Sequence, residues 1–139
     1  NNSVSSETPK DISNSPFVKK IRDAVRKSGI KLNISFEFFD QNQMIEYLSK
    51  NTINIFPFSQ LGDGSGISSS LDVALSCRRP FAISDCVLFK HVLEYNLPIT
   101  LRDNSIVDII ARGTSVLDPI YKDWSRESVL KRLEDLIGV

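Results

Sequence analysis

Residues 53–84, INIFPFSQLGDGSGISSSLDVALSCRRPFAIS, hold two short apolar stretches separated by a Gly- and Ser-rich run and a helix-like segment. The first stretch, 53–59, is rich in β-branched and aromatic residues, and Pro57 stands near its end, where a missing ladder hydrogen bond matters least. Apolar residues at helical spacing over 67–77 then lead to the apolar run 80–84. The order strand, loop, helix, strand is typical of a parallel βαβ unit.

The rest of the chain continues this alternation. Period-two patterns predict strands at 31–36 and 97–101. Apolar periodicity with start and stop signals predicts helices over 16–28, 40–48, 87–92, 104–113 and 125–138. We therefore expect an α/β fold, a Rossmann-like three-layer sandwich with a mostly parallel sheet and helices on both faces.

The length and polarity of the chain predict one domain. Its 139 residues, 41% of them hydrophobic and 24% charged, can bury one sizeable core. Residues 1–14 are polar and too poor in large apolar groups to offset the cost of ordering, so we expect a flexible lead-in followed by a single domain over 15–139. Met44 is the only methionine, which favours a piece of a longer protein.

Charge and cysteine usage argue against several function classes. Basic and acidic residues balance at 17 each, so no basic field favours nucleic acid. No apolar run approaches the roughly 20 residues of a transmembrane helix. Cys77 and Cys86 form no metal-ligand pattern and no disulfide framework. We expect a cytoplasmic protein without a metal or a cofactor.

The Gly- and Ser-rich run is the candidate binding site. In open α/β sheets ligands bind at the carboxyl ends of strands, and this run joins an expected strand end to an expected helix start. Glycine permits close approach of backbone N–H groups, and a helix N-terminus attracts phosphate. The candidate ligand-binding residues in the run are Gly64, Ser65, Gly66, Ile67 and Ser68. An ordinary turn with a serine N-cap is the alternative.

Several elements in fixed order resemble a known family. QMIEYLSKN (43–51) precedes the strand end IFPFS (55–59), the Gly-rich loop follows, and then come ALSCRRP (74–80) and FAISD (81–85). This order resembles the C-terminal, nucleotide-sugar-binding half of glycosyltransferases with the GT-B fold. The resemblance covers about residues 30–92. It implies that backbone donors at 66–68 bind the diphosphate of a nucleotide sugar.

The acidic residues of that family transfer only in part. Many retaining members carry one glutamate in the Gly-rich loop and a second on the following helix, where it binds the donor ribose. The corresponding positions here are Ser65 and Val73. Asp72 is one residue away from the second position and is a candidate for ligand contact, with a surface or capping role as the alternative, because one residue turns a helical side chain by roughly 100°.

Other chemistry-bearing residues favour structural roles. His91 is the only histidine and has no partner nearby in the sequence. Arg78 and Arg79 lie at a helix C-terminus, where cations stabilise the helix dipole. Trp124 is expected to pack the last helices against the sheet. No pair of carboxylates has the setting of an acid and base, so catalytic residues are not assigned.

The sequence thus supports three hypotheses. The first is the donor-binding half of a glycosyltransferase, which uses a nucleotide sugar, acts on an unknown acceptor and needs an N-terminal domain of the same protein to complete its active site. The second is a non-catalytic GT-B-like module that binds a glycan or a protein partner. The third, a flavodoxin-like signalling domain, is disfavoured because no acidic cluster ends an early strand.

Overall fold

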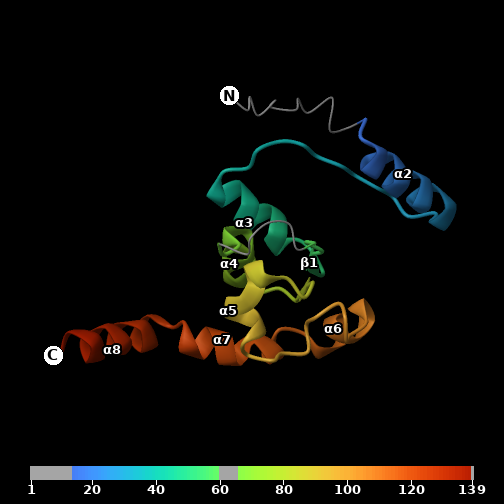
Figure 1. Ribbon diagram of the computed structural model, residues 1–139. Coiled ribbons are helices and arrows are strands. Elements are labelled where there is room, and N and C mark those ends of the chain that lie inside the picture. The colour runs from blue at the N-terminus through green and yellow to red at the C-terminus, as the bar shows by residue number, and fades with distance from the viewer. Residues whose placement is uncertain (1–13, 60–65, 139) are drawn as a thin grey trace, which may run out of the picture. The chain divides into compact units, whose positions relative to one another are not determined.

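The structure, a computed structural model, describes residues 14–59 and 66–138 (Figure 1). The chain divides into two compact units, Asn1–Phe39 and Asp40–Val139. The division falls inside the single domain expected over 15–139, which stays a prediction. None of the described helices is long and apolar enough to cross a membrane.

The first unit contains helix α2, Pro16–Ser28. The Ser15 hydroxyl accepts a hydrogen bond from the backbone N–H of Val18 at 3.3 Å, and Pro16 occupies the first helical position. Gly29 ends the helix in the left-handed conformation, with φ of 71°. The predicted start and stop of this helix are confirmed.

The strand predicted over 31–36 is not formed. Residues 30–39 have no regular secondary structure. A strand requires a hydrogen-bonded partner, and no described residue pairs with this segment. The Ser35 hydroxyl instead accepts the backbone N–H of Glu37 at 3.2 Å, which gives the chain a local alternative to a ladder bond. Alternating sequence without a partner strand leaves an irregular extended segment.

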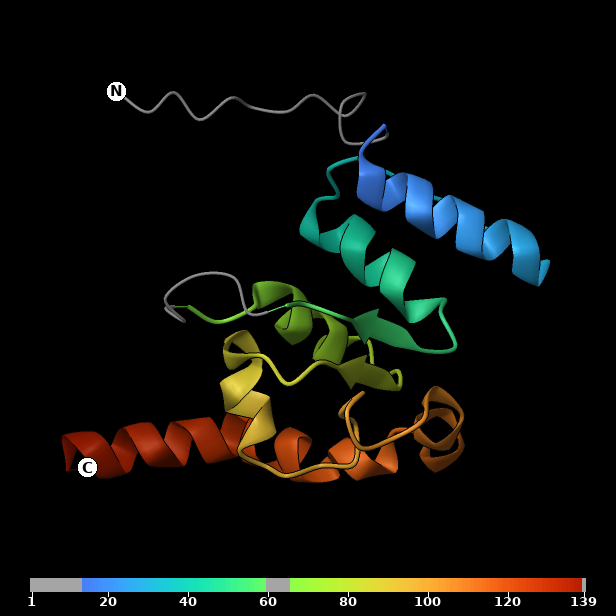
Figure 2. The ribbon, with the colours of Figure 1, turned by 45° about the vertical axis from the view of Figure 1, so that its right-hand side comes forward.

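The second unit is built on two parallel strands, β1 (Asn54–Phe56) and β2 (Phe81–Ile83). Helix α4 (Ser69–Ser76) lies between them in sequence, and Figure 2 shows the two arrows side by side. Two strands can be parallel only when the chain crosses back between them, and α4 makes that crossover. The βαβ unit predicted from residues 53–84 is confirmed.

The strand predicted over 97–101 is reduced to a single parallel bridge between Ile83 and Thr100. Ile83 donates its N–H to the carbonyl of Ile99 at 3.1 Å, and its carbonyl accepts the N–H of Leu101 at 2.8 Å. Pro98 has no N–H to extend the ladder. The described sheet is therefore two strands with one flanking bridge, smaller than predicted.

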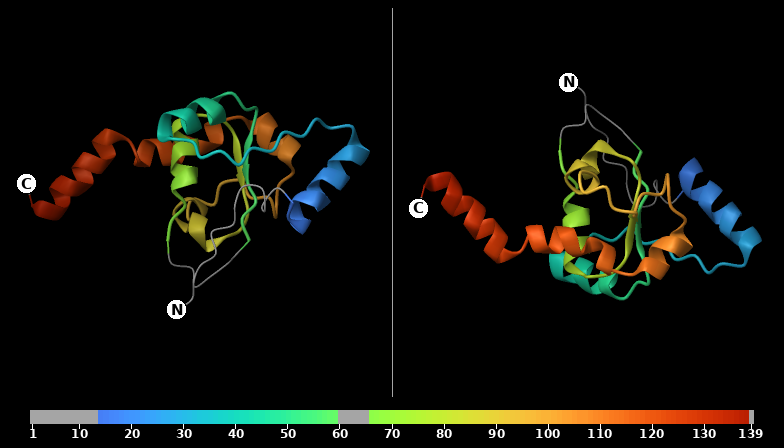
Figure 3. Two further views of the ribbon diagram at one scale, coloured as in Figure 1. Left: turned by 90° about the horizontal axis from the view of Figure 1, so that it is seen from above. Right: turned by 90° about the horizontal axis from the view of Figure 1, so that it is seen from below.

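The other elements of this unit are short helices. Asp40 and Gln43 form a reciprocal capping box at the start of α3. Figure 3 shows α4 and α5 on one side of the two strands and α6 on the other, so the fold is mixed α/β with helices on both sides of the pair. The bounds are α3 Gln41–Ser49, η1 Val87–Phe89, α5 Lys90–Leu93, α6 Ile106–Arg112, η2 Ser115–Leu117, α7 Asp118–Asp123 and α8 Arg126–Ile137.

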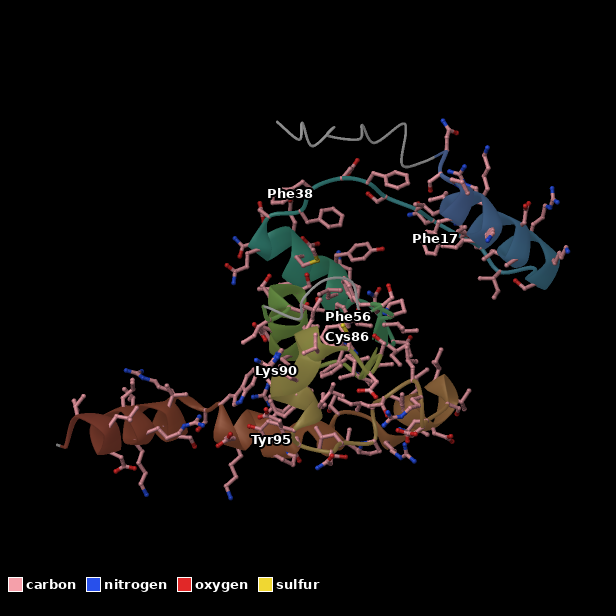
Figure 4. The ribbon with its side chains drawn as sticks, viewed as in Figure 1. Phe17, Phe38, Phe56, Cys86, Lys90 and Tyr95 are labelled. Carbon is pink, nitrogen blue, oxygen red and sulfur yellow. The ribbon has the colours of Figure 1, made fainter. Side chains whose placement is uncertain are left out.

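The core is centred on β2. All three of its residues, Phe81, Ala82 and Ile83, have no exposed surface. Phe89 packs edge-to-face against Phe56, with ring centroids 6.4 Å apart. Figure 4 shows Phe56 and Cys86 in this same region: Cys86 belongs to the buried apolar cluster, and Phe56 is partly buried and packs against it. Burial of β2 on both faces explains its short, entirely apolar sequence.

One polar side chain, Asn54, is buried at the start of β1 with 4% of its surface exposed. Its Nδ2 donates to the carbonyl of Leu48 at 3.2 Å, and its Oδ1 accepts from Asn51 at 2.8 Å. Its backbone N–H donates to the carbonyl of Pro80 at 3.0 Å. These bonds satisfy the amide and tie the end of α3 to β1.

Trimming β2 should lower the free energy of unfolding. We expect a loss of about 0.5–1.5 kcal/mol for Ile83→Val and about 3–5 kcal/mol for Phe81→Ala, measured by urea unfolding with circular dichroism. Val107→Ala, on the exposed face of α6, serves as the control and should change stability by less than about 0.5 kcal/mol. An Ile83→Val protein as stable as the wild type would contradict the central position of β2.

Candidate functional site

The start of α4 has the geometry of a backbone donor site. Gly66 has φ of 120°, a conformation that favours glycine, and Ser68 is the N-cap residue. The Ser68 N–H donates to the carbonyl of Leu88 at 3.2 Å, so one of the three predicted donors already has a partner. The first turn of a helix also presents N–H groups without intrahelical partners, which here belong to Ser69 and Ser70.

The remaining predicted loop residues are placed as follows. Gly64 and Ser65 lie outside the described residues. Ile67 lies beside Gly66, and its side chain is exposed, so it can contribute through its backbone. An added Cβ on Gly66 would lie 3.8 Å from Cδ2 of Leu88, which is ordinary contact distance. There is room for a Cβ at position 66, so it is the backbone conformation of Gly66 that disfavours other residues there.

The carboxyl ends of β1 and β2 are joined by Ser84. Its backbone N–H donates to the carbonyl of Phe56 at 3.1 Å, and its hydroxyl donates to the carbonyl of Phe58. Asp85 follows and forms an ion pair with Arg102, which is also 3.2 Å from the Asp103 carboxylate. Asp85, Arg102 and Asp103 border a cavity of about 360 Å³.

Asp72 is directed toward another element. Its Oδ1 lies 3.3 Å from Nε2 of His91, which comes from α5. His91 is largely buried, with 13% of its side chain exposed, and its ring stacks on Trp124 at a centroid distance of 5.7 Å and an interplanar angle of 16°. The side chain proposed as a ligand contact is thus part of a cluster of Asp72, His91 and Trp124.

The imidazole of His91 is unusual in this cluster. Both of its ring nitrogens are buried, and neither has a hydrogen-bond partner among the described residues. The carboxylate of Asp72 is close enough for an ion pair but is not aligned for a hydrogen bond. His91 is thus held between a carboxylate and an indole ring, without a hydrogen bond to either ring nitrogen from the described residues.

A second polar cluster adjoins Trp124. The Tyr95 hydroxyl donates to the carboxylate of Asp123, and the Arg132 guanidinium donates to the Asp123 carbonyl at 2.6 Å. Figure 4 shows Tyr95 beside α7, which carries Asp123 at its end. Burial, followed by the hydrogen bond to Asp123, raises the pKa of the Tyr95 hydroxyl. The phenol therefore stays a donor and holds the junction of α7 and α8.

These clusters were not predicted from the sequence. Asp72 and His91 are far apart along the chain, and no spacing rule links a residue of α4 to one of α5. Asp85 is only the last residue of the FAISD stretch in the sequence, and nothing in the pattern indicates its partner Arg102. Across residues 14–59 and 66–138, no three His, Cys, Asp or Glu side chains gather as a metal site would require.

Comparison with known proteins gave no match, whether the chain was compared with family models, with curated proteins or with solved structures.

The stacked pair makes a spectroscopic prediction. Trp124 is the only tryptophan of the chain, so indole emission reports on this cluster alone. The imidazole of His91 covers one face of the indole, so its removal should let water reach that face. We expect the Trp124 emission maximum of His91→Ala to lie at longer wavelength than that of the wild type.

Two variants test the assignment. His91→Ala removes the ring that stacks on the indole, whereas Asp72→Asn keeps that ring and should leave the emission maximum close to that of the wild type. An unchanged maximum in His91→Ala would show that the indole does not stack on His91.

Proposed function

We propose that this chain is the donor-binding half of a glycosyltransferase, which transfers a sugar from a nucleotide sugar to an acceptor. The observation that carries the proposal is the β1–α4–β2 crossover, with Gly66 and the first turn of α4 directly after the loop that leaves β1. Ligands of open α/β folds bind at such an edge, and helix N-termini bind phosphate groups. In the complete protein, this half is a Rossmann-like three-layer sandwich in the cytoplasm.

The proposed roles follow from the donors at this edge. The backbone N–H groups of Ser69 and Ser70 hold the donor diphosphate, and Gly66 lets it approach the backbone. The Ser68 N–H keeps its bond to Leu88 and fixes the loop against η1. The acceptor is bound by another domain of the same protein, so the chain by itself binds the donor without completing the transfer.

A non-catalytic module is the second candidate, and the side chains of α4 favour it. Val73, at the position of a ribose-binding glutamate, is apolar and half-buried, and it cannot accept a hydrogen bond. Asp72, the neighbouring carboxylate, faces His91. If these departures remove donor binding, the remaining function is recognition of a glycan or a protein.

Removing one backbone donor tests the first candidate. Proline is tolerated at the first position of a helix, and Ser68 already has the extended conformation required before proline, with ψ of 102°. Ser69→Pro should therefore fold normally and lose one charge-assisted hydrogen bond, about 1.5–3 kcal/mol of binding free energy. Isothermal titration calorimetry with UDP-glucose, UDP-N-acetylglucosamine and GDP-mannose measures the loss.

The matched control is Ile106→Pro, at the first position of α6, where Ser105 has ψ of 152°. It makes the same kind of change away from the proposed donor site and should leave nucleotide-sugar affinity unchanged. Failure of the wild-type chain to bind any of the three donors, or equal binding by Ser69→Pro, would favour the module.

Gly66 provides an independent prediction. Gly66→Ala and Gly113→Ala both place a side chain at positive φ, 120° and 65°, and both should lose stability by about 1–2 kcal/mol. Only Gly66→Ala should also weaken nucleotide-sugar binding, because Gly113 ends α6. Calorimetry paired with thermal melts separates the two effects. Equal affinities in the two variants would mean that the loop is an ordinary turn.

A further inference from the structure

A separate cavity of about 650 Å³ lies between α4 and the end of α7. Its volume is within the range of small-molecule sites, about 300–1,000 Å³. Apart from two aliphatic side chains, its lining consists of two aromatic rings, two hydroxyls, one carboxylate and one guanidinium, from Tyr121, Trp124, Ser76, Ser125, Asp72 and Arg78. It thus combines apolar surfaces with polar side chains.

Arg78 reaches this cavity from a strained backbone. Its φ is 49°, in the left-handed region that glycine prefers and that costs other residues roughly 1–2 kcal/mol. Its guanidinium lies over the ring of Tyr121, 4.9 Å from the centroid. Arg78 directly follows the C-cap residue of α4, at the position where helices commonly end with one left-handed residue, usually glycine. Glycine would relieve the backbone but would remove the guanidinium.

The two aromatic rings are held in place. The Tyr121 hydroxyl donates to the carbonyl of Leu75 at 3.2 Å, and burial raises the pKa of this phenol, so it remains a donor. The Trp124 ring packs against His91 and still has 37% of its residue surface exposed. Both rings therefore offer preorganised surface to a ligand, which lowers the entropy cost of binding.

The mixture of groups selects the ligand class. A lipid chain needs a continuous apolar lining, and a free phosphate needs an excess of cations, whereas this lining carries one guanidinium, Arg78, and one carboxylate, Asp72. A pyranose ring presents C–H bonds on its faces and hydroxyls around its rim, which fits aromatic rings bordered by serine, carboxylate and guanidinium groups. We propose that this cavity binds a neutral saccharide.

The saccharide site is independent of the proposed donor site. The donor site uses backbone N–H groups at the start of α4. The cavity is lined instead by side chains, both of α4 and of Arg78, which lies just after the end of α4. The two sites can therefore be tested apart. Ser69→Pro should leave saccharide binding unchanged, whatever it does to nucleotide-sugar binding.

The experiment titrates the 139-residue chain with glucose, galactose, mannose, N-acetylglucosamine, maltose and cellobiose up to the solubility of each, at constant pH. Trp124 emission and calorimetry report binding, and uridine and adenosine form a second series. We expect a saturable change of emission with at least one saccharide and none with the nucleosides. Arg78→Gly and Trp124→Ala should each weaken that saccharide about tenfold, by calorimetry.

Arg79→Ala is the matched control, because Arg79 donates to the carbonyl of Ser49 at 2.7 Å and does not line the cavity. It should bind as the wild type does. Arg78→Gly removes the strained conformation and should not lower the melting temperature, so its loss of binding cannot be ascribed to unfolding. Binding to nucleosides only, no binding to any saccharide, or full affinity in Arg78→Gly would overturn the proposal.

Discussion

The parallel pairing of β1 with β2 is the constraint on which the second unit depends. Parallel strands cannot be joined by a tight turn, so the chain between Phe56 and Phe81 must cross the unit and return. Helix α4 makes that crossing, and its direction places its first turn after the loop from β1. The same pairing brings Ser84 against the carbonyls that follow β1, which closes one edge of the sheet with hydrogen bonds.

Helix α4 consequently serves two regions at once. Its buried side chains, Leu71, Ala74 and Leu75, anchor it in the core. Its first turn offers backbone donors, while Asp72 faces His91, and the residues just beyond its end direct Arg78 toward Tyr121. The proposed donor site and the proposed saccharide site therefore use different groups of the same helix.

The sequence was most informative where structure depends on neighbouring residues. The helix starts predicted at 16 and 40 and the βαβ order over 53–84 all depend on groups a few positions apart, and all are found to within a residue or two. The strand predicted at 31–36 is absent because a strand needs a neighbouring strand to pair with, and an alternating sequence does not show whether such a neighbour exists.

The candidate site shows the same limit. Gly66 and Ser68 could be located from a local glycine and serine pattern. The contact of Asp72 with His91, the ion pair of Asp85 with Arg102 and the stacking on Trp124 each join distant parts of the chain. Arg78 follows the C-cap residue of α4, where a left-handed residue is common, but glycine is the usual residue there and an arginine does not indicate that backbone in the sequence.

The buried amide of Asn54 has a consequence for how the chain selects this arrangement. A shift of two residues along β1 would keep the same face inward, so apolar packing discriminates poorly between such registers. It would, however, carry the amide away from Leu48 and Asn51 and leave a buried polar group without partners. Asn54 therefore favours one register of the sheet over others. It raises the free energy of shifted registers, which a purely apolar strand would tolerate.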